Sequence, residues 1–404
     1  MHHRRKDSNQ PAGGGQEPAF VNRFSVPFEY PVYFTRGLCE LENPLLVDTL
    51  DRLTEERRHR AAVYIDSGVT DTHPDLVDRI KAYFHRYSDG IELAGTPEIL
   101  AGGEVAKNNW KSVQDVMFAI GNLHLDRQNF IIAIGGGSVL DMVGFAASIV
   151  HRGLRLIRIP TTTLAQCDSG VGVKNSMNEH GQKNFVGTFA PPFAVLNDYE
   201  FLSTLSEQHW IGGVAEAFKV ALIKDGAFFE YLCRNARALA TRDGAIMEEV
   251  IHRCAIIHLE HISESGDPFE FGSARPLDFG HWAGHKLETT SDYALGHGQC
   301  VAIGIGLDSY YAMRHDLIST SDLERILSAM EECGLPTWTD HLAAWKKADS
   351  LIVNDALDQF REHLGGILNV TLPSGIGQRV EVHHMDRSII GDGLDYLEKR
   401  AKKR

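Results

Sequence analysis

The sequence predicts an α/β fold, in which a domain built on a parallel β-sheet is followed by a mostly α-helical domain. Three observations predict it. Short β-branched runs alternate with longer amphipathic stretches as far as about Phe201, and long helical patterns take over after that residue. In addition, 404 residues exceed the usual size of one hydrophobic core. We therefore expect a sheet domain at residues 21–199 and a helical domain at residues 200–404.

The expected elements follow in order along the chain. Residues 1–20 are polar and rich in glycine, so we expect a disordered tail and a fold that starts near Phe24. The hydrophobic pattern then predicts strands in AAVYIDSGV, NFIIAIGGG and LRLIRIPTTTLA, and helices in HPDLVDRIKAYFHRY, SVQDVMFAIGNLHLD and SVLDMVGFAASIVHRG. Later helical patterns are HWIGGVAEAFKVALI, GAIMEEVIHRCAIIHLEHI and GQCVAIGIGLDSYYAMRH.

Composition disfavours several classes of partner. The formal net charge of -14 would repel a polyanion, so we expect no nucleic-acid partner. The six cysteines include no C-x-x-C pair, which favours free thiols in a reducing compartment. The N-terminus has no apolar signal region, and no segment reaches about 18 uninterrupted apolar residues, so we expect no membrane span. Together these features predict a cytoplasmic protein.

A glycine-rich turn is the candidate nucleotide site. Gly135, Gly136 and Gly137 stand between an expected buried strand and a helix that begins near Ser138. Glycines allow backbone to approach a pyrophosphate, and the helix N-terminus presents free N–H groups to it. Asp66, at the end of an earlier strand, is a candidate for binding an adenosine ribose. The alternatives are a tight turn without a ligand and, for Asp66, a helix cap.

A histidine-rich segment is the candidate metal site. His281 and His285 are four residues apart and share one face of an expected helix, and His297 follows in a glycine-flanked loop. Imidazoles that meet a carboxylate bind zinc or another divalent ion. Glu216 and Lys219 lie at i and i+3 on an apolar helix, where charges are costly unless they are paired or bound to a ligand. Structural histidines and a helical salt bridge are the alternatives.

A polar belt connects the two expected domains. Residues 160–198 place Asp168, Lys174, Lys183 and Asn184 among glycines and prolines. Cations and an amide donor near a glycine-rich turn suit a phosphorylated substrate. A surface Ω-loop without a ligand is the alternative.

Taken together, these segments resemble 3-dehydroquinate synthase and its sugar phosphate cyclase relatives. The matching motifs run in family order between residues 60 and 310: GGEVAKN, AIGGGSVLDMVGF, HRGLRLIRIPTT, LAQCDSGVGVK, GQKNFVGTFAPP, FLSTL, GVAEAFK, DFGHWAGH and LGHGQCVAIG. The resemblance implies a Rossmann-like NAD-binding domain, a helical metal-binding domain, a sugar phosphate substrate and a homodimer.

The resemblance also implies roles for individual residues. The ligands of Zn2+, or of another divalent metal such as Co2+, would be Glu216, His281 and His297. Residues that contact the substrate would be Lys174, Asn184, Lys219, Asp278, His285 beside its phosphate, and Arg152, which in the family reaches across the dimer interface. NAD contacts would fall on Asp66, Glu104, Lys107, Gly135, Gly136, Gly137, Asp141, Thr161, Thr162, Asp168, Lys183 and Thr204.

The implied reaction uses NAD catalytically. Transient oxidation of a ring hydroxyl acidifies the neighbouring C–H and permits loss of phosphate, and re-reduction then restores NAD. The metal polarises the hydroxyl and the carbonyl, while basic side chains hold the phosphate. Ring opening and an intramolecular aldol closure, which need mainly positioning, give a carbocycle.

The sequence departs from 3-dehydroquinate synthase where that enzyme binds the carboxylate of its substrate. Residues 255–267 contain neither Lys nor Arg, Ala274 stands at the position of an Arg, with Arg275 next to it, and Asp278 stands at that of an Asn. The FREHLGG segment resembles the 2-epi-5-epi-valiolone synthase branch, and RPLDFGHW resembles an Ebo-type branch. These differences favour a heptulose phosphate without a carboxylate, such as sedoheptulose 7-phosphate.

Three other functions are considered. One is true 3-dehydroquinate synthase, which acts on the seven-carbon acid phosphate DAHP. Another is a metal-dependent alcohol or glycerol dehydrogenase, which shares GGGSVLD and a His-rich helical domain, but the belt of Lys174, Lys183 and Asn184 argues against it. The third is an inactive nucleotide-binding or scaffold protein, which the intact set of Glu216 and two histidines disfavours.

Overall fold

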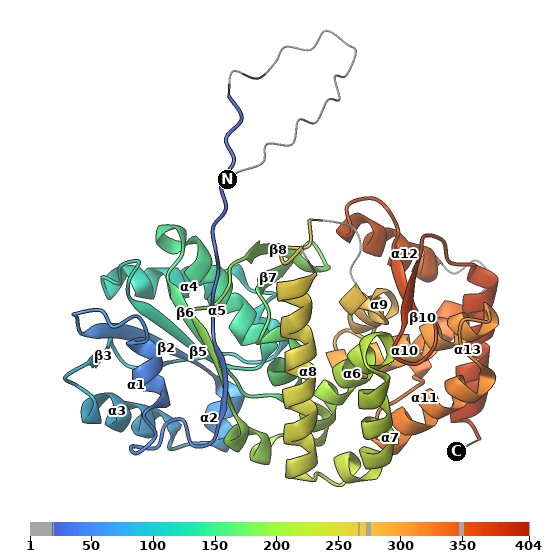
Figure 1. Ribbon diagram of the computed structural model, residues 1–404, viewed down its shortest axis with the longest axis horizontal. Helices are drawn as coiled ribbons and strands as arrows, with labels where there is room; N and C mark the ends of the chain where they lie inside the picture. Colours follow the sequence, from blue (N-terminus) through green and yellow to red (C-terminus); the bar gives the residue numbers. More distant parts are fainter. Residues whose placement is uncertain (1–17, 19, 266, 272–275, 347–350, 404) are drawn as a thin grey trace, which may run out of the picture.

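The structure, a computed structural model, describes residues 18, 20–265, 267–271, 276–346 and 351–403. An α/β part that contains the central sheet and a part made mostly of helices lie side by side (Figure 1). Strand β9 ends at Asp198 and the long helix α6 begins at Glu207, so the expected boundary near residue 199 falls between them. The tail expected at residues 1–20 lies outside the described residues, apart from Pro18 and Phe20.

The central sheet has seven parallel strands. Val63 lies opposite Ile132, and Ile132 lies opposite Ile157, so the apolar runs are in register and are buried on both faces. The strands in spatial order are β1 (Val32–Thr35), β9 (Ala194–Asp198), β6 (Arg155–Pro160), β5 (Phe130–Gly135), β2 (His59–Asp66) and β3 (Ile91–Leu93), with β4 (Glu98–Leu100) also paired to β2.

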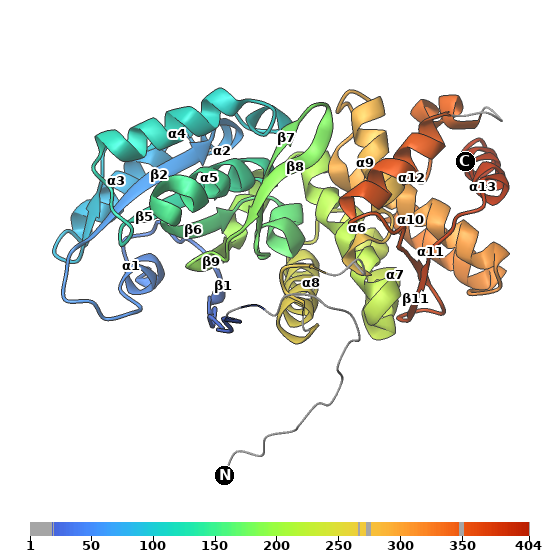
Figure 2. The same ribbon diagram turned by 90° about the horizontal axis from the view of Figure 1, so that it is seen from above.

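Helices cover both faces of this sheet. Successive strand residues point to opposite faces, so Val63 packs with one set of helices and Tyr64 with the other. Helices α1 and α5 lie on opposite sides of the sheet (Figure 2). One layer contains α1 (Leu45–Leu50), α2 (Ser67–Thr72) and α3 (Leu76–Arg86), and the other contains α4 (Trp110–Asn122) and α5 (Gly137–Ile149).

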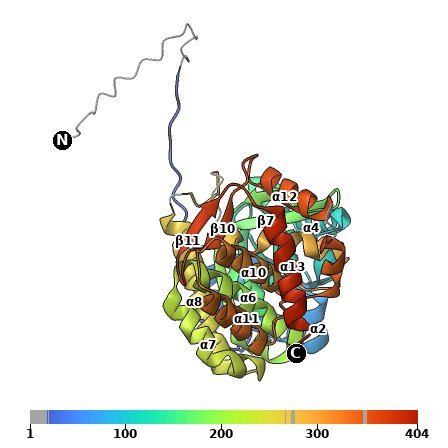
Figure 3. The same cartoon turned by 90° about the vertical axis from the view of Figure 1, so that its right-hand side faces the viewer.

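The helical part packs around α10, which the other helices surround (Figure 3). Asp225 and Asp243 cap α7 and α8 by accepting hydrogen bonds from backbone N–H groups. The elements are α6 (Glu207–Lys224), α7 (Gly226–Ala240), α8 (Gly244–Glu264), α9 (His281–Thr290), α10 (His297–Arg314), α11 (Thr320–Glu332), α12 (Leu351–His363), the hairpin β10 (Val370–Pro373) with β11 (Arg379–Val382), and α13 (Arg387–Ala401).

Glycines bring three of these helices close together. A Cβ on Gly298 of α10 would lie 2.2 Å from the carbonyl oxygen of Gly212 on α6. Similarly, a Cβ on Gly304 would lie 2.0 Å from the carbonyl oxygen of Gly280, the N-cap of α9. Since no larger residue fits at either crossing, the start of α10 is held against α6, and the start of α9 is held against the middle of α10.

The structure confirms the predicted fold class and the order of its main elements. It also gives the polar belt a defined form. A π-helical turn at Ala165–Ser169 is followed by an antiparallel hairpin of β7 (Lys174–Glu179) and β8 (Gln182–Phe189), so the Ω-loop alternative is wrong. Among the described residues, no helix combines the length and hydrophobicity that crossing a bilayer requires.

Candidate active site

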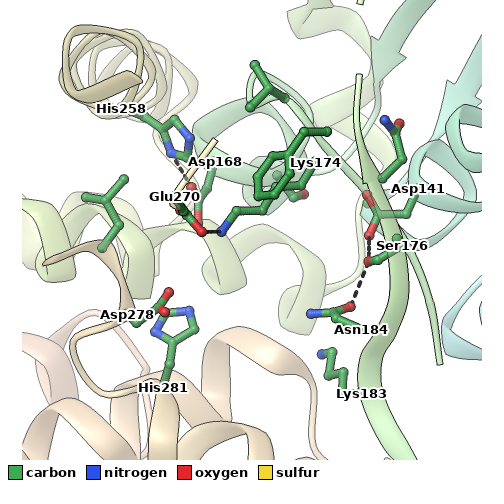
Figure 4. A pocket seen from close by; sticks show the side chains of 18 of the residues that line it. Asp141, Asp168, Lys174, Ser176, Lys183, Asn184, His258, Glu270, Asp278 and His281 are labelled. Atoms are coloured by element: carbon green, nitrogen blue, oxygen red, sulfur yellow. Dashed lines mark hydrogen bonds and ion pairs between the residues drawn. The ribbon is translucent and has the colours of Figure 1, made fainter. Parts of the chain in front are cut away.

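A cavity of about 470 Å³ lies where the hairpin of the α/β part meets α6, α8 and α9. Figure 4 shows side chains from both parts pointing into it. The predicted site residues that are not among those lining it are Asp66, Gly135, Gly136, Arg152, Thr161, Thr162, Thr204 and Glu216. The predicted site residues that do line it are Glu104, Lys107, Gly137, Asp141, Asp168, Lys174, Lys183, Asn184, Lys219, Asp278, His281, His285 and His297.

The three predicted metal ligands converge. Glu216 lies in the middle of α6, and His281 and His297 are the first residues of α9 and α10. The Nε2 atoms of His297 and His281 lie 3.3 Å and 4.0 Å from Glu216 Oε1, and ligand atoms of all three lie within 4.8 Å of one another. The close helix crossings described above produce this convergence.

This donor set fits a divalent cation. Glu216 is completely buried, and the helical salt bridge given as the alternative is present, because Lys219 pairs with Glu216 Oε2. The same lysine also pairs with Asp168, so one ammonium faces two carboxylates, and Glu216 Oε1 remains directed at the two imidazoles. One carboxylate and two imidazoles, with room for a further ligand on the cavity side, are the donors of a catalytic zinc site.

The local charges suit metal binding. Burial raises the pKa of Glu216, but Lys219, His297 and His281 together outweigh burial and keep the pKa below its usual value. Burial and the charge of Lys219 lower the pKa of His281, which favours the neutral imidazole that a metal requires. Burial also lowers the pKa of His297, yet Glu288 and Glu216 raise it to about 9. The position between these two carboxylates therefore attracts positive charge.

Lys219 is buried between two carboxylates. Its Nζ lies 3.1 Å from Asp168 Oδ2 and also pairs with Glu216. Burial lowers the pKa of Lys219, but Asp168 and Glu216 raise it above its usual value, so the lysine stays charged. The other oxygen of Asp168 pairs with His258 of α8, which also lines the cavity (Figure 4).

The hairpin presents an amide to the cavity. Lys107 Nζ contacts Asp141 at 2.6 Å, Ser176 Oγ at 2.9 Å and the Asn184 oxygen. Ser176 also donates to the Asn184 oxygen, so the Asn184 nitrogen is the end that points into the cavity (Figure 4). Asn184 has a φ of 55°, a strained conformation that this network and a hydrogen bond from its backbone N–H to Asn178 stabilise.

Each lysine of the cavity is paired with a carboxylate, but only Lys174 is largely accessible. Its side chain is 51% exposed, and its Nζ lies 2.7 Å from Glu270 Oε2. By contrast, the side chain of Lys183 is 9% exposed and pairs with Glu288. Asp278 lies on the opposite wall beside His281 (Figure 4).

The glycine turn, which is the candidate nucleotide site, lies at the carboxyl ends of the strands. Gly135 ends β5, and α5 begins at Gly137 without a side-chain cap at Gly136, which leaves its first N–H groups available. A Cβ on Gly137 would lie 2.6 Å from Ser169 Oγ, and one on Gly136 would lie 3.4 Å from Thr162 Cγ2. The backbone at this turn suits the close approach of a pyrophosphate.

Of the other residues predicted to bind the nucleotide, some lie beside this turn and others do not. Asp66 caps α2 by accepting from Gly68 N, and burial raises its pKa although Gly68 and Gly136 donate to it. Glu104 accepts from Ser138 Oγ at 3.0 Å, which fixes it beside the start of α5. Thr161 follows β6 directly, whereas Thr204 lies beside α2, where its hydroxyl contacts His73.

Sequence reasoning missed several residues of this site. Glu288 joins Lys183 to His297. The sequence could have indicated it, because it lies three residues after His285 on the same helix. His258 and Glu270 carried no signal, because only the fold brings them to Asp168 and Lys174. Ala274 and Arg275, which bear on carboxylate binding, lie outside the described residues.

Comparisons with known proteins cover most of the chain. A model described as 3-dehydroquinate synthase N-terminal matches residues 98–212, and one described as 3-dehydroquinate synthase C-terminal matches residues 213–356. A 2-epi-valiolone synthase from Actinosynnema mirum is 32% identical over 335 residues, which cover 83% of this chain and 84% of that protein. A 3-dehydroquinate synthase from Rhizobium meliloti is 38% identical over 293 residues, covering 72% of this chain and 76% of that protein.

Among solved structures, a similar one is ValA, a 2-epi-5-epi-valiolone synthase from Streptomyces hygroscopicus subsp. jinggangensis 5008 with NAD+ and Zn2+ bound. The TM-score is 0.84 and the sequence identity is 28%. The match covers 94% of this chain and 100% of that chain, so both parts of the fold are included.

Proposed function

The chain belongs to the 3-dehydroquinate synthase family, and from this premise we propose that it is a sugar phosphate cyclase that uses NAD catalytically and a divalent metal. It converts a heptulose phosphate into a carbocycle with release of phosphate. The observation that carries the proposal is the convergence of Glu216, His281 and His297 at the wall of a cavity that also holds Lys174 and the glycine turn. Relatives of this chain include a 2-epi-valiolone synthase and a structure with NAD+ and Zn2+ bound.

The chain's own residues hold the two cofactors. Glu216, His281 and His297 would bind Zn2+ or Co2+, and the turn at Gly135–Gly137 would bind the NAD pyrophosphate, with Asp66 at its ribose. When bound, NAD accepts and returns a hydride, and the metal polarises the oxygen at the reacting carbon. The Lys219 ammonium pairs with both Asp168 and Glu216, which helps to keep Glu216 ionised.

Basic and amide groups on the opposite wall bind the phosphate. The half-exposed Lys174 can exchange Glu270 for the phosphate at little desolvation cost, and the Asn184 nitrogen points into the same space. Burial and the charge of His281 hold the pKa of His285 well below its usual value, so His285 is neutral and donates one N–H rather than a charge. Because the two walls of the cavity enclose the open-chain intermediate, they keep it in position for the aldol step.

The charges of the cavity favour a substrate without a carboxylate. Its lysines are already paired, as Lys107 with Asp141, Lys174 with Glu270 and Lys183 with Glu288. Asp278 adds a further acidic group to the cavity wall opposite the hairpin. A second anion on the substrate would have to displace one of these carboxylates. We therefore propose sedoheptulose 7-phosphate, or a closely related heptulose phosphate without a carboxylate, as the substrate.

The experiment supplies the purified protein with NAD and Zn2+, and then with either sedoheptulose 7-phosphate or DAHP. The expected result is phosphate release from the heptulose phosphate without net NADH, and no release from DAHP. Release from DAHP alone would establish true 3-dehydroquinate synthase, a second candidate that the relative from Rhizobium meliloti favours. Stoichiometric NADH from a simple alcohol, without phosphate release, would instead establish an alcohol dehydrogenase.

We also propose that the enzyme is a cytoplasmic homodimer. Arg152 is exposed on a turn where its φ is 65°, outside the cavity of its own chain. It would reach substrate only in the cavity of a second copy, which supports a dimer with shared sites. The six free cysteines, five of which are buried, support a reducing compartment.

A further inference from the structure

Two overlapping groups of side chains in the described residues have the spacing of a metal site. Glu216, His281 and His297 form one, and His285, Glu288 and His297 form the other. They share His297, whose ring has only two nitrogens. Nε2 faces Glu216 at 3.3 Å, and Nδ1 faces Glu288 Oε2 at 3.1 Å. A cation bound through Nε2 leaves Nδ1 protonated, and its proton is then donated to Glu288.

The other oxygen of Glu288 is also occupied. Glu288 Oε1 pairs with Lys183 of β8, and both side chains are nearly inaccessible, with exposed fractions of 4% and 9%. The Lys183 ammonium therefore already neutralises the second group, which would otherwise need a cation of its own. Since β8 belongs to the hairpin and His297 begins α10, this one carboxylate joins the nucleotide side of the cavity to the metal side.

We propose that Glu288 is a positioning residue that aims His297 at the metal and ties the β7–β8 hairpin to the metal centre through Lys183. Glu288 is not itself a ligand, and the chain binds one metal ion at Glu216, His281 and His297. The inference rests on the proposed metal site, but it does not depend on which sugar phosphate is the substrate.

This arrangement should affect both the affinity for the metal and the coupling between the metal and β8. A carboxylate that accepts from a ligating imidazole fixes the ring and raises its basicity, and loss of such a group typically weakens metal binding about 10- to 100-fold. A metal that holds His297 in turn holds Glu288 and Lys183, so metal binding should order β8. By linkage, ordering of β8 should strengthen metal binding by the same factor.

The test measures zinc binding to the metal-free protein in the absence of NAD and substrate, by competition with a chromophoric chelator. Glu288→Gln should weaken zinc binding about 10- to 100-fold. Lys183→Met leaves the contact between Glu288 and His297 and removes only the coupling to β8, so it should weaken zinc binding less than Glu288→Gln does. The matched control is Glu331→Gln, which removes the charge of another poorly exposed glutamate, one paired with Arg400 far from the metal.

A second readout follows hydrogen exchange of residues 182–189. Zinc should slow their exchange in the wild type but not in Lys183→Met, although that variant still binds zinc. Unchanged zinc affinity in Glu288→Gln, equal losses in Lys183→Met, or two zinc ions per wild-type chain would overturn the inference. A wild-type chain that binds no zinc would instead overturn the proposed metal site. Circular dichroism of the metal-free variants shows whether each has folded.

Discussion

Glu216 Oε1 lies 3.3 Å from His297 Nε2, although the two residues belong to different helices. The carboxylate is completely buried, and Lys219 pairs with its Oε2 while the two imidazoles approach its Oε1. The fold thus holds an ionised group in the interior and directs two imidazoles at the oxygen that the helical salt bridge leaves available, which is the arrangement of a metal site. Gly137 of the glycine turn, Lys174 and the two histidines all line one cavity, and the role proposed for each can be tested separately.

The glycine turn is tested by Gly137→Ala. The added Cβ would lie 2.6 Å from Ser169 Oγ and would stand at the start of α5, where the pyrophosphate must approach. We expect NAD affinity, measured by calorimetry, to fall about tenfold or more, as for the loss of one charge-assisted hydrogen bond. Gly121→Ala in α4 is the control, because no atom lies within 4 Å of its added Cβ. Equal affinity in both variants would contradict a nucleotide site at this turn.

Lys174 is tested by its removal. Lys174→Ala takes away the accessible ammonium of the phosphate-binding wall, so binding of sedoheptulose 7-phosphate should weaken by more than about 1.5 kcal/mol. Calorimetry on the complex with NAD and zinc measures the loss. NAD affinity should not change, since Lys174 is not among the residues expected to contact NAD. Unchanged sugar phosphate affinity would remove Lys174 from the site.

The proposal that each cavity receives Arg152 from the other subunit of a dimer is tested by mixing two inactive variants. Arg152→Ala and Lys174→Ala should each lose turnover, but a mixed dimer contains one cavity with both residues intact. Random exchange of subunits makes half the dimers mixed, so activity should return to about a quarter of the wild-type value. No recovery after subunit exchange, followed by native mass spectrometry, would show that Arg152 does not act in the cavity of a second copy.

The buried carboxyl group of Asp308 should make the stability of the fold depend on pH. It is buried on α10 and accepts from Trp282 Nε1 at 2.8 Å and from Gly280 N at 3.0 Å. Burial raises its pKa to about 7, although these two hydrogen bonds lower it. The unfolded chain loses this proton near pH 4, so between pH 4 and 7 the folded state binds more protons. The contribution of Asp308 to stability must therefore fall as the pH rises through this interval.

Urea unfolding of the metal-free protein checks this expectation. The difference in free energy of unfolding between the wild type and Asp308→Asn should decrease by on the order of 4 kcal/mol from pH 4 to pH 7. Taking the difference removes the contributions of the other titrating groups. A difference that is constant or increases with pH would show that Asp308 is ionised in the folded protein.

Much of the fold could be predicted from the sequence because its signals are local. The continuous apolar run before Gly135 predicts a strand buried on both faces, and the glycines after it predict the turn, as the structure shows. The hairpin at residues 174–189 could not be predicted in the same way. Its strands are polar, because Lys174, Lys183 and Asn184 serve the cavity, and they lack the alternation that marks a strand.

The site could be predicted only in part. The spacing of His281 and His285 predicts a shared helix face, but it does not reveal that His297 is the second imidazole near Glu216. That selection depends on the crossing of α10 and α6 at Gly298 and Gly212, which is a contact between distant segments. Glu288 escaped prediction for a related reason, because its two partners come from different parts of the fold.

Anomalous diffraction at the zinc edge, from crystals grown with NAD and zinc, locates the bound metal ion. We expect one peak per chain, within bonding distance of Glu216, His281 and His297 and adjacent to the nicotinamide ring, and no peak in Glu216→Ala. A peak among His285, Glu288 and His297 instead, or no peak in the wild type, would contradict the proposed metal site.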